Sequence, residues 1–237
     1  MNSVCFKPLN NSTFLGVDMT PELDWQAIDT VLLDMDGTLL DLYFDNYFWQ
    51  QYLPEHWAAK QGIAPEQAHQ QLRSWYEKEA GTLSWYCLDY WTNRLGIDVL
   101  ALKADVDHLI GKRPYAENFL QRLQQSRFRV VMVTNSHERL IEMKMQKTGI
   151  DIYFDEIISS HRIGHAKEEQ AFWQRLQDEI GFASESSLLV DDNLTVLRTA
   201  REYGIAHLLA IASPDSSAGV QDTAEFTPLH CFSHLDF

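Results

Sequence analysis

The sequence predicts an α/β fold in which an all-helical insert interrupts a parallel sheet. Two observations support this prediction: short apolar runs alternate with helical segments, and residues 43–112 contain no strand-like run. Alternating strands and helices are typical of a parallel sheet that is covered on both faces. We therefore expect an N-terminal extension (1–25), a first core segment (26–42), a helical cap (43–112) and a second core segment (113–237).

The first core segment and the cap differ in composition. Residues 30–33, Thr-Val-Leu-Leu, form a short apolar run that is followed by Asp34 and Gly37. This pattern indicates a buried strand and the loop at its C-terminal end. Residues 43–112 are rich in Trp, Tyr, Gln, Ala and Glu, and Pro65 is well placed in the first turn of one helix.

The second core segment returns to alternation after Pro114. Strands are predicted at 130–133, 154–158, 188–190 and 207–211. Helices are predicted at 116–126, 137–148, 168–180 and 194–203. Gly149, Gly181 and Gly204 follow the last three of these helices, and glycine readily adopts the left-handed conformation that ends a helix.

The charge of the chain narrows the possible partners. Lys and Arg number 19 while Asp and Glu number 34, which gives a formal net charge of −15. A chain this acidic is not expected to bind duplex nucleic acid or an anionic membrane through general electrostatics. The sequence has no 18-residue apolar stretch and no secretory-signal pattern, and its three cysteines form no C-x-x-C pair. We expect a cytoplasmic protein that acts on a small molecule.

Polar side chains follow three of the predicted strands, and open α/β sheets bind ligands beyond the carboxyl ends of their strands. These residues, with one lysine that precedes a helix, are Asp34, Asp36, Thr134, Asn135, Lys167, Asp191 and Asp192. Four neighbouring carboxylates repel one another unless a cation neutralises them, and an oxygen-rich site suits Mg²⁺. No cluster of His or Cys suggests zinc. A hydroxyl and a lysine can supply a hydrogen-bond donor and a positive charge for phosphate oxygens.

These motifs resemble, in order, those of the haloacid dehalogenase-like (HAD) phosphohydrolase superfamily, over about residues 26–212. The first motif is the apolar strand followed by Asp-Met-Asp-Gly-Thr at 34–38, which is a highly specific signal. The other three are Thr134-Asn135, Lys167 and Asp191-Asp192, which are weak alone and strong by position. The resemblance implies a Rossmann-like, HAD-like core with an inserted helical cap of the C1 type.

The resemblance also implies roles for the acidic residues. Asp34 would be the nucleophile that becomes an aspartyl-phosphate, and Asp36 would protonate the leaving oxygen and then activate water. Mg²⁺ would be held by the carboxylates of Asp34 and Asp191 and by the backbone carbonyl of Asp36. Asp192 would support the metal directly or through water.

The remaining motif residues are implied to bind the phosphate. Thr134 and the adjacent Asn135 would contact its oxygens, and Lys167 would orient both the phosphate and the nucleophile. In many members a proline flanks this lysine, whereas here its neighbours are Ala166 and Glu168.

A closer resemblance links residues 33–49, 85–91 and 213–216 to bacterial GMP/IMP nucleotidases of the same superfamily. It implies a purine nucleoside 5′-monophosphate as the substrate. Asp45 and Asn46 follow the first strand closely, so we expect one of them to contact the sugar or the base. Most aromatic residues of the cap are expected to pack its interior, with one or two stacking on the purine.

Two alternatives stay open. The first is a phosphatase for a sugar phosphate or phosphoglycolate, or a phosphomutase, of the same superfamily. A dehalogenase is disfavoured, because those enzymes lack the second aspartate of the first motif, present here as Asp36. The second alternative is a non-catalytic binding protein on the same scaffold, which is disfavoured because every catalytic and metal-binding position is filled. The sequence does not predict the oligomeric state.

Overall fold

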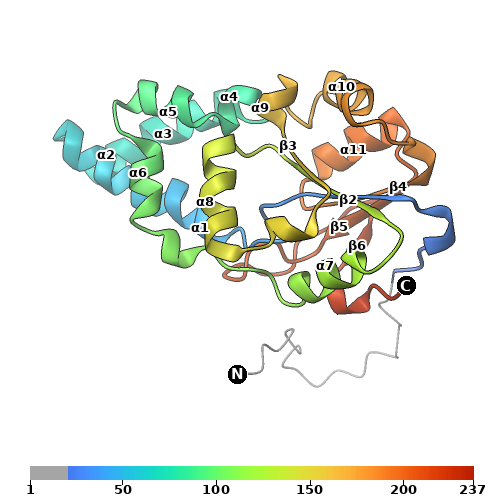
Figure 1. Ribbon diagram of the computed structural model, residues 1–237. Coiled ribbons are helices and arrows are strands. Elements are labelled where there is room, and N and C mark those ends of the chain that lie inside the picture. Colours follow the sequence, from blue (N-terminus) through green and yellow to red (C-terminus); the bar gives the residue numbers. More distant parts are fainter. Residues whose placement is uncertain (1–20) are drawn as a thin grey trace.

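A six-stranded parallel sheet forms the core of the computed structural model, which describes residues 21–237 (Figure 1). Its strands are β1 (Thr30–Leu33), β2 (Arg129–Thr134), β3 (Glu156–Ser159), β4 (Ser187–Asp191), β5 (His207–Ile211) and β6 (Thr227–Leu229). Their order in the sheet is β3-β2-β1-β4-β5-β6. This is a doubly wound order whose direction reverses between β1 and β4, and such a reversal opens a crevice beyond the strand ends. The predicted α/β fold with a Rossmann-like sheet is confirmed.

Helices cover both faces of the sheet because side chains along each strand point alternately to opposite sides. In β1, Val31 and Leu33 join a hydrophobic cluster with α7 (Ala116–Gln124) and α8 (Glu138–Thr148). Leu32 instead joins the cluster formed with α9 (Ser160–Ile163), α10 (Gln170–Ile180) and α11 (Leu194–Tyr203). Both faces of the central strand are therefore buried, as the uninterrupted apolar run predicts.

The helical insert lies beside the sheet as a separate lobe (Figure 1). Its helices are α1 (Tyr43–Tyr47), α2 (Leu53–Gln61), α3 (Pro65–Glu79), α4 (Leu83–Tyr86), α5 (Leu88–Leu95) and α6 (Val99–Ala104), with a π-helical stretch at Phe48–Tyr52. Trp57, Trp91 and Leu95 are buried in its interior. The exact domain limits at 42/43 and 112/113 stay a prediction. Within residues 21–237, no helix has both the length and the apolar character needed to cross a bilayer.

The two connections of the insert to the core run side by side. The backbone N–H of Asp41 donates to the carbonyl of Gly111 (2.8 Å), and the N–H of Arg113 donates to the carbonyl of Leu39 (2.9 Å). The buried guanidinium of Arg113 also donates to the carbonyl of Gly37 (2.8 Å). The segment that returns from the cap is thereby tied to the loop that follows β1.

One strand and one α-helix of the core were not expected from the sequence. Strand β6 has three residues, and its Pro228 lacks an N–H, so it carries almost no strand pattern and lies at the edge of the sheet. Helix α9 is one turn that the side chain of Ser159 caps at its start and that Gly164 ends. Residues 1–20 of the predicted extension lie outside the described residues, whereas Trp25 packs its ring against Phe128 and Phe237.

Candidate active site

A cavity of about 280 Å³ lies between the carboxyl ends of the strands and the cap. It is lined by all of the predicted site residues: Asp34, Asp36, Asp45, Asn46, Thr134, Asn135, Lys167, Asp191 and Asp192. The parallel register explains how residues far apart in sequence meet there. Leu33 in β1 pairs with Val190 in β4 and with Met132 in β2, so the segments that follow these strands emerge at one edge.

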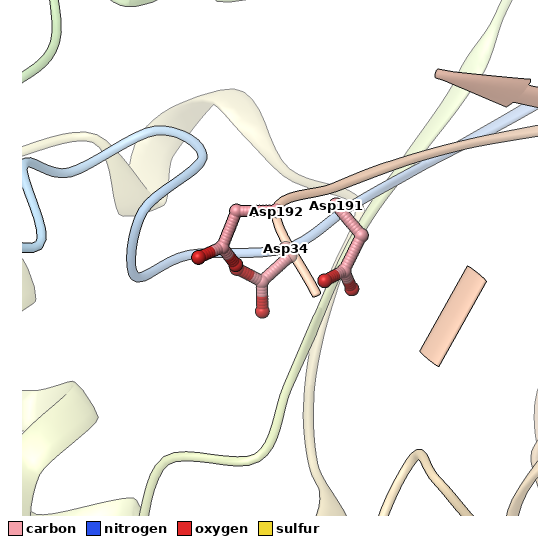
Figure 2. A group of neighbouring side chains, drawn as sticks. All are labelled: Asp34, Asp191 and Asp192. Atoms are coloured by element: carbon pink, nitrogen blue, oxygen red, sulfur yellow. The ribbon is translucent and has the colours of Figure 1, made fainter. Parts of the chain in front are cut away.

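Three carboxylates gather at the point where the strand order reverses. Asp34 follows β1, and Asp191 and Asp192 lie at the end of β4 (Figure 2). One oxygen from each of them lies within 4.8 Å of the other two. Gly37 makes room for this group, because a Cβ at that position would lie 2.4 Å from Oδ2 of Asp192. Its φ of +84° is also a conformation that favours glycine.

Lys167 compensates part of this negative charge. Its Nζ lies 2.6 Å from Oδ1 of Asp34 and 2.7 Å from Oδ2 of Asp191, and it donates to the carbonyl of Val133 (3.1 Å). Burial alone would lower the pKa of this lysine, but Asp191 and Asp34 outweigh burial and raise it. Lys167 is therefore a permanent positive charge between two of the three carboxylates.

One lysine does not neutralise three carboxylates, of which Asp34 and Asp191 are buried and Asp192 is half-buried. Burial raises the pKa of Asp34 to about 6 in spite of Lys167. Burial, together with the charges of Asp34 and Asp191, raises the pKa of Asp192 well above its usual range. A group of oxygen ligands with excess negative charge has the chemistry that a hard divalent cation such as Mg²⁺ prefers, so these residues fit the expected metal.

The carboxylate of Asp36 lies apart from these three. Its Oδ1 is 2.6 Å from Nζ of Lys144, and burial raises its pKa to about 6 although the lysine lowers it. The same Nζ lies 2.7 Å from Oδ2 of Asp45, whose Oδ1 is 2.7 Å from Nζ of Lys103. Burial alone would raise the pKa of Asp45, but Lys103 and Lys144 outweigh it and hold that pKa well below the usual range.

The loop after β2 presents hydroxyl and amide groups to the cavity. Asn135 accepts from the backbone N–H of Lys167 (2.9 Å) and donates through its amide to Glu168 (2.9 Å). Thr134 Oγ1 accepts from the N–H of Ser136 (3.0 Å), which leaves its own hydroxyl hydrogen for another acceptor. The hydroxyl of Ser136 is buried and has no hydrogen-bond partner within the described part of the chain.

The cap closes the other side of the cavity. Trp49, Trp85 and Leu88 are among its apolar lining residues. The hydroxyl of Tyr86 donates to Glu168 (2.6 Å), which lies directly after the site lysine. A second contact joins cap and core where Asn46 donates to Asp215 (2.6 Å) in the loop after β5.

Sequence reasoning missed Lys103, Lys144, Ser136 and Glu168 as lining or supporting residues. Lys144 carried a usable signal, because it lies four residues after Leu140 on the buried face of α8. A lysine at an apolar position of an amphipathic helix indicates a buried partner. The partner itself lies more than one hundred residues away, and only the tertiary structure identifies it.

Comparisons with known proteins support the family resemblance that the motifs indicate. The family model described as haloacid dehalogenase-like hydrolase matches residues 28–204. The enzyme named GMP/IMP nucleotidase YrfG from Escherichia coli (strain K12) is 41% identical over 89% of this chain and 95% of its own length.

Solved structures show the same fold at low sequence identity. The HAD phosphatase from Thermococcus onnurineus is 19% identical, with a TM-score of 0.72 over 87% of this chain and 95% of its own. The putative HAD-hydrolase YfnB from Bacillus subtilis is 18% identical, with a TM-score of 0.57 over 78% of this chain and 88% of its own. The resemblance inferred from the motifs is thus confirmed, and the chain belongs to the haloacid dehalogenase-like hydrolase family as a phosphatase-type enzyme.

Proposed function

We propose that this enzyme is a Mg²⁺-dependent phosphomonoesterase that hydrolyses a purine nucleoside 5′-monophosphate, GMP or IMP. The single observation that supports this choice of substrate is the 41% identity to a GMP/IMP nucleotidase across 89% of the chain. The cavity supports it, because a carboxylate-rich end for the phosphate joins an aromatic wall that suits a base.

The metal ligands in this proposal are the carboxylates of Asp34, Asp191 and Asp192 with the backbone carbonyl of Asp36. Their support is the convergence of three carboxylates, two of which pair with Lys167. When bound, Mg²⁺ would neutralise this charge and polarise a phosphoryl oxygen.

The reaction would then run in two steps through the protein's own carboxylates. An oxygen of Asp34 attacks the phosphorus, the bond from phosphorus to the 5′ oxygen breaks, and Asp36 gives its proton to that leaving oxygen. Water next attacks the aspartyl-phosphate, Asp36 takes the proton from the water, and inorganic phosphate leaves Asp34 as a free carboxylate. Splitting the displacement in this way replaces one difficult step with two easier ones.

The phosphate oxygens would be held by the hydroxyl of Thr134, the Asn135 segment and the ammonium of Lys167. Asp34, Asp191 and the carbonyl of Val133 already occupy the three N–H donors of Lys167. Lys167 would therefore supply a fixed positive charge beside the phosphate, and a direct hydrogen bond to a phosphate oxygen would replace one of these contacts. Ser136 adds a buried hydroxyl that lacks a partner in the described residues and lines the same cavity.

The nucleoside would occupy the cap side of the cavity, against Trp49 and Trp85. Of the two residues predicted to contact sugar or base, Asn46 is the better candidate. Both oxygens of Asp45 accept from lysines, whereas Asn46 gives one amide hydrogen to Asp215 and keeps the other. A small-molecule phosphate ester is therefore the proposed partner. The cytoplasmic location and the lack of binding to nucleic acid stay predictions.

A substrate panel tests this proposal. Purified enzyme with Mg²⁺ is assayed for phosphate release from GMP, IMP, other nucleotides, sugar phosphates and phosphoglycolate. We expect the highest kcat/KM for GMP or IMP. Preference for a sugar phosphate or phosphoglycolate would show that the proposed substrate is wrong. Turnover of none of these esters would favour a non-catalytic binding protein.

Asp34→Asn tests the mechanism separately. We expect a loss of at least about 10³-fold in kcat, since the amide is a poor nucleophile. Circular dichroism and the melting temperature should show that the variant remains folded. Substantial activity in this variant would rule out Asp34 as the nucleophile.

A further inference from the structure

Four charged side chains of alternating sign form a chain of ion pairs next to the cavity, in which the lysines are buried and the aspartates partly exposed: Asp36, Lys144, Asp45 and Lys103. The three successive contacts measure 2.6, 2.7 and 2.7 Å. The side chains of Lys144 and Lys103 are 1% and 0% exposed. Asp36 lies in the loop after β1, Lys144 on α8, and Asp45 and Lys103 on α1 and α6. The chain of ion pairs therefore links the core to the cap.

Stability alone does not account for this arrangement. Removing four charges from water is costly, and a buried ion pair commonly contributes no more than apolar side chains of similar volume. The arrangement does fix geometry, however, because each inner member of the chain contacts two oppositely charged neighbours. We therefore look for the function of these ion pairs in the positions in which they hold the side chains.

The core half of this chain is the pair Asp36–Lys144. Nζ of Lys144 donates to Oδ1 of Asp36. The other oxygen, Oδ2, is therefore the one that would carry the proton that Asp36 transfers. Lys144 lies on α8 with Leu140 and Met145 buried beside it, and its stem is thereby packed into the core. A carboxylate that is held by one oxygen presents the other in a defined direction.

The cap half is the pair Asp45–Lys103. The ammonium of Lys103 lies 4.7 Å from the ring centre of Phe44 and 4.3 Å from that of Phe48, and such faces attract cations. Lys103 therefore holds Asp45 within the cap. The single 2.7 Å contact between Asp45 and Lys144 is where the cap half meets the core half.

We propose that Lys144 is a positioning residue that orients Asp36, and that Asp45, held by Lys103, keeps Lys144 in place when the cap is seated. This inference rests on the acid role that the proposed function gives to Asp36. It assigns Asp45 to the support of the proton donor and not to contact with the base.

The dependence of the rate on the leaving group tests this role. Lys144→Met is compared with wild type on IMP, whose alkoxide must be protonated to leave, and on p-nitrophenyl phosphate, whose phenolate leaves unaided. We expect kcat/KM to fall at least about 10²-fold for IMP, the usual contribution of general acid catalysis, and less than about 5-fold for p-nitrophenyl phosphate. Lys147→Met is the matched control on the same helix, where Lys147 forms a surface ion pair with Asp107, and it should change neither value.

A charge-balanced variant keeps the test decisive if Lys144→Met does not fold. Asp45→Asn combined with Lys103→Met removes one charge of each sign and leaves the Asp36–Lys144 pair intact. We expect a loss on IMP of about 10-fold, again without a similar loss on p-nitrophenyl phosphate. Equal losses on both substrates, or an unchanged rate on IMP in the folded variants, would overturn the inference.

The result can be separated from failure of the proposed function. If wild-type enzyme prefers another alkyl phosphate, the proposed substrate is wrong, and the same comparison is made with that ester in place of IMP. The positioning role then stands or falls on the leaving-group dependence alone.

Discussion

Asp192 is the site carboxylate whose charge receives the least compensation. Lys167 lies within 2.7 Å of oxygens of both Asp34 and Asp191, whereas no ion pair joins it to Asp192 among the described residues. Burial and the two neighbouring carboxylates raise the pKa of Asp192 well above its usual range. At neutral pH its ionised form therefore opposes folding until a cation is present.

Asp192→Asn should consequently stabilise the metal-free protein while weakening its response to Mg²⁺. With a chelator present, we expect the melting temperature to rise by about 2–6 °C, since about 2–4 °C corresponds to 1 kcal/mol in a chain of this size. The further rise on adding Mg²⁺ should be smaller than in wild type. Thermal unfolding measures the melting temperature with chelator and its rise on adding Mg²⁺. Asp151→Asn, at an exposed position, is the control. A lower melting temperature of the chelated variant would contradict this account.

At the scale of elements, the central strands and the loops that follow them are what sequence patterns could predict. The β1 prediction matches the strand in full, because an uninterrupted apolar run followed by Asp-x-Asp-Gly specifies both the strand and its end. The motif residues other than Lys167 lie at the ends of apolar strands, and Lys167 lies shortly before α10, so the site could be assembled from the chain order. Lys144 could not be paired with Asp36 in the same way, because that contact depends on how α8 packs beside the loop after β1.

The loop after β1 offers a test at this scale. Gly37→Ala should disturb the proposed metal ligands, because the Cβ of the alanine would lie 2.4 Å from Oδ2 of Asp192. We expect the Mg²⁺ concentration for half-maximal activity to rise at least about 10-fold, whereas the cost of a left-handed alanine, about 1–2 kcal/mol, acts on the stability of the fold. Titration of activity with Mg²⁺ measures this.

Gly62→Ala is the matched control for Gly37→Ala. Gly62 has a similar positive φ of +65°, yet nothing lies within 4 Å of a Cβ placed there. It therefore carries the backbone cost without the contact. If the two variants required the same concentration of Mg²⁺, the packing of Gly37 against Asp192 would have no part in metal binding.

At the scale of the whole molecule, the proposed metal site would couple folding, metal binding and pH. Burial raises the pKa of Asp34 to about 6 from a usual 3.8. The metal-free folded state thus holds this proton more tightly than the unfolded chain does, and this residue's contribution to stability falls as pH rises from about 4 to above 6. A cation bound at the proposed site would compete with that proton, so its binding should strengthen over the same range.

The stabilisation by Mg²⁺ should therefore depend on pH. At one fixed Mg²⁺ concentration, we expect a larger increase in melting temperature at pH 7.5 than at pH 5.5, because ligand binding stabilises the folded state according to its affinity. The increase is measured against a chelated sample at each pH, with NaCl of equal ionic strength as the control. Equal increases at the two pH values would contradict the coupling.

The position of β1 has a consequence for how the protein forms on the ribosome. It is the first strand along the described chain, yet its partners β2 and β4 come only after the whole helical insert and after α10, respectively. Synthesis at roughly 5–20 residues per second leaves this apolar strand without a neighbour for several seconds. The helices of the insert make mostly local contacts and can assemble in that interval. The order of the elements along the chain thus favours folding of the cap before the sheet. Until β2 is synthesised, β1 is an exposed apolar segment that chaperones would shield.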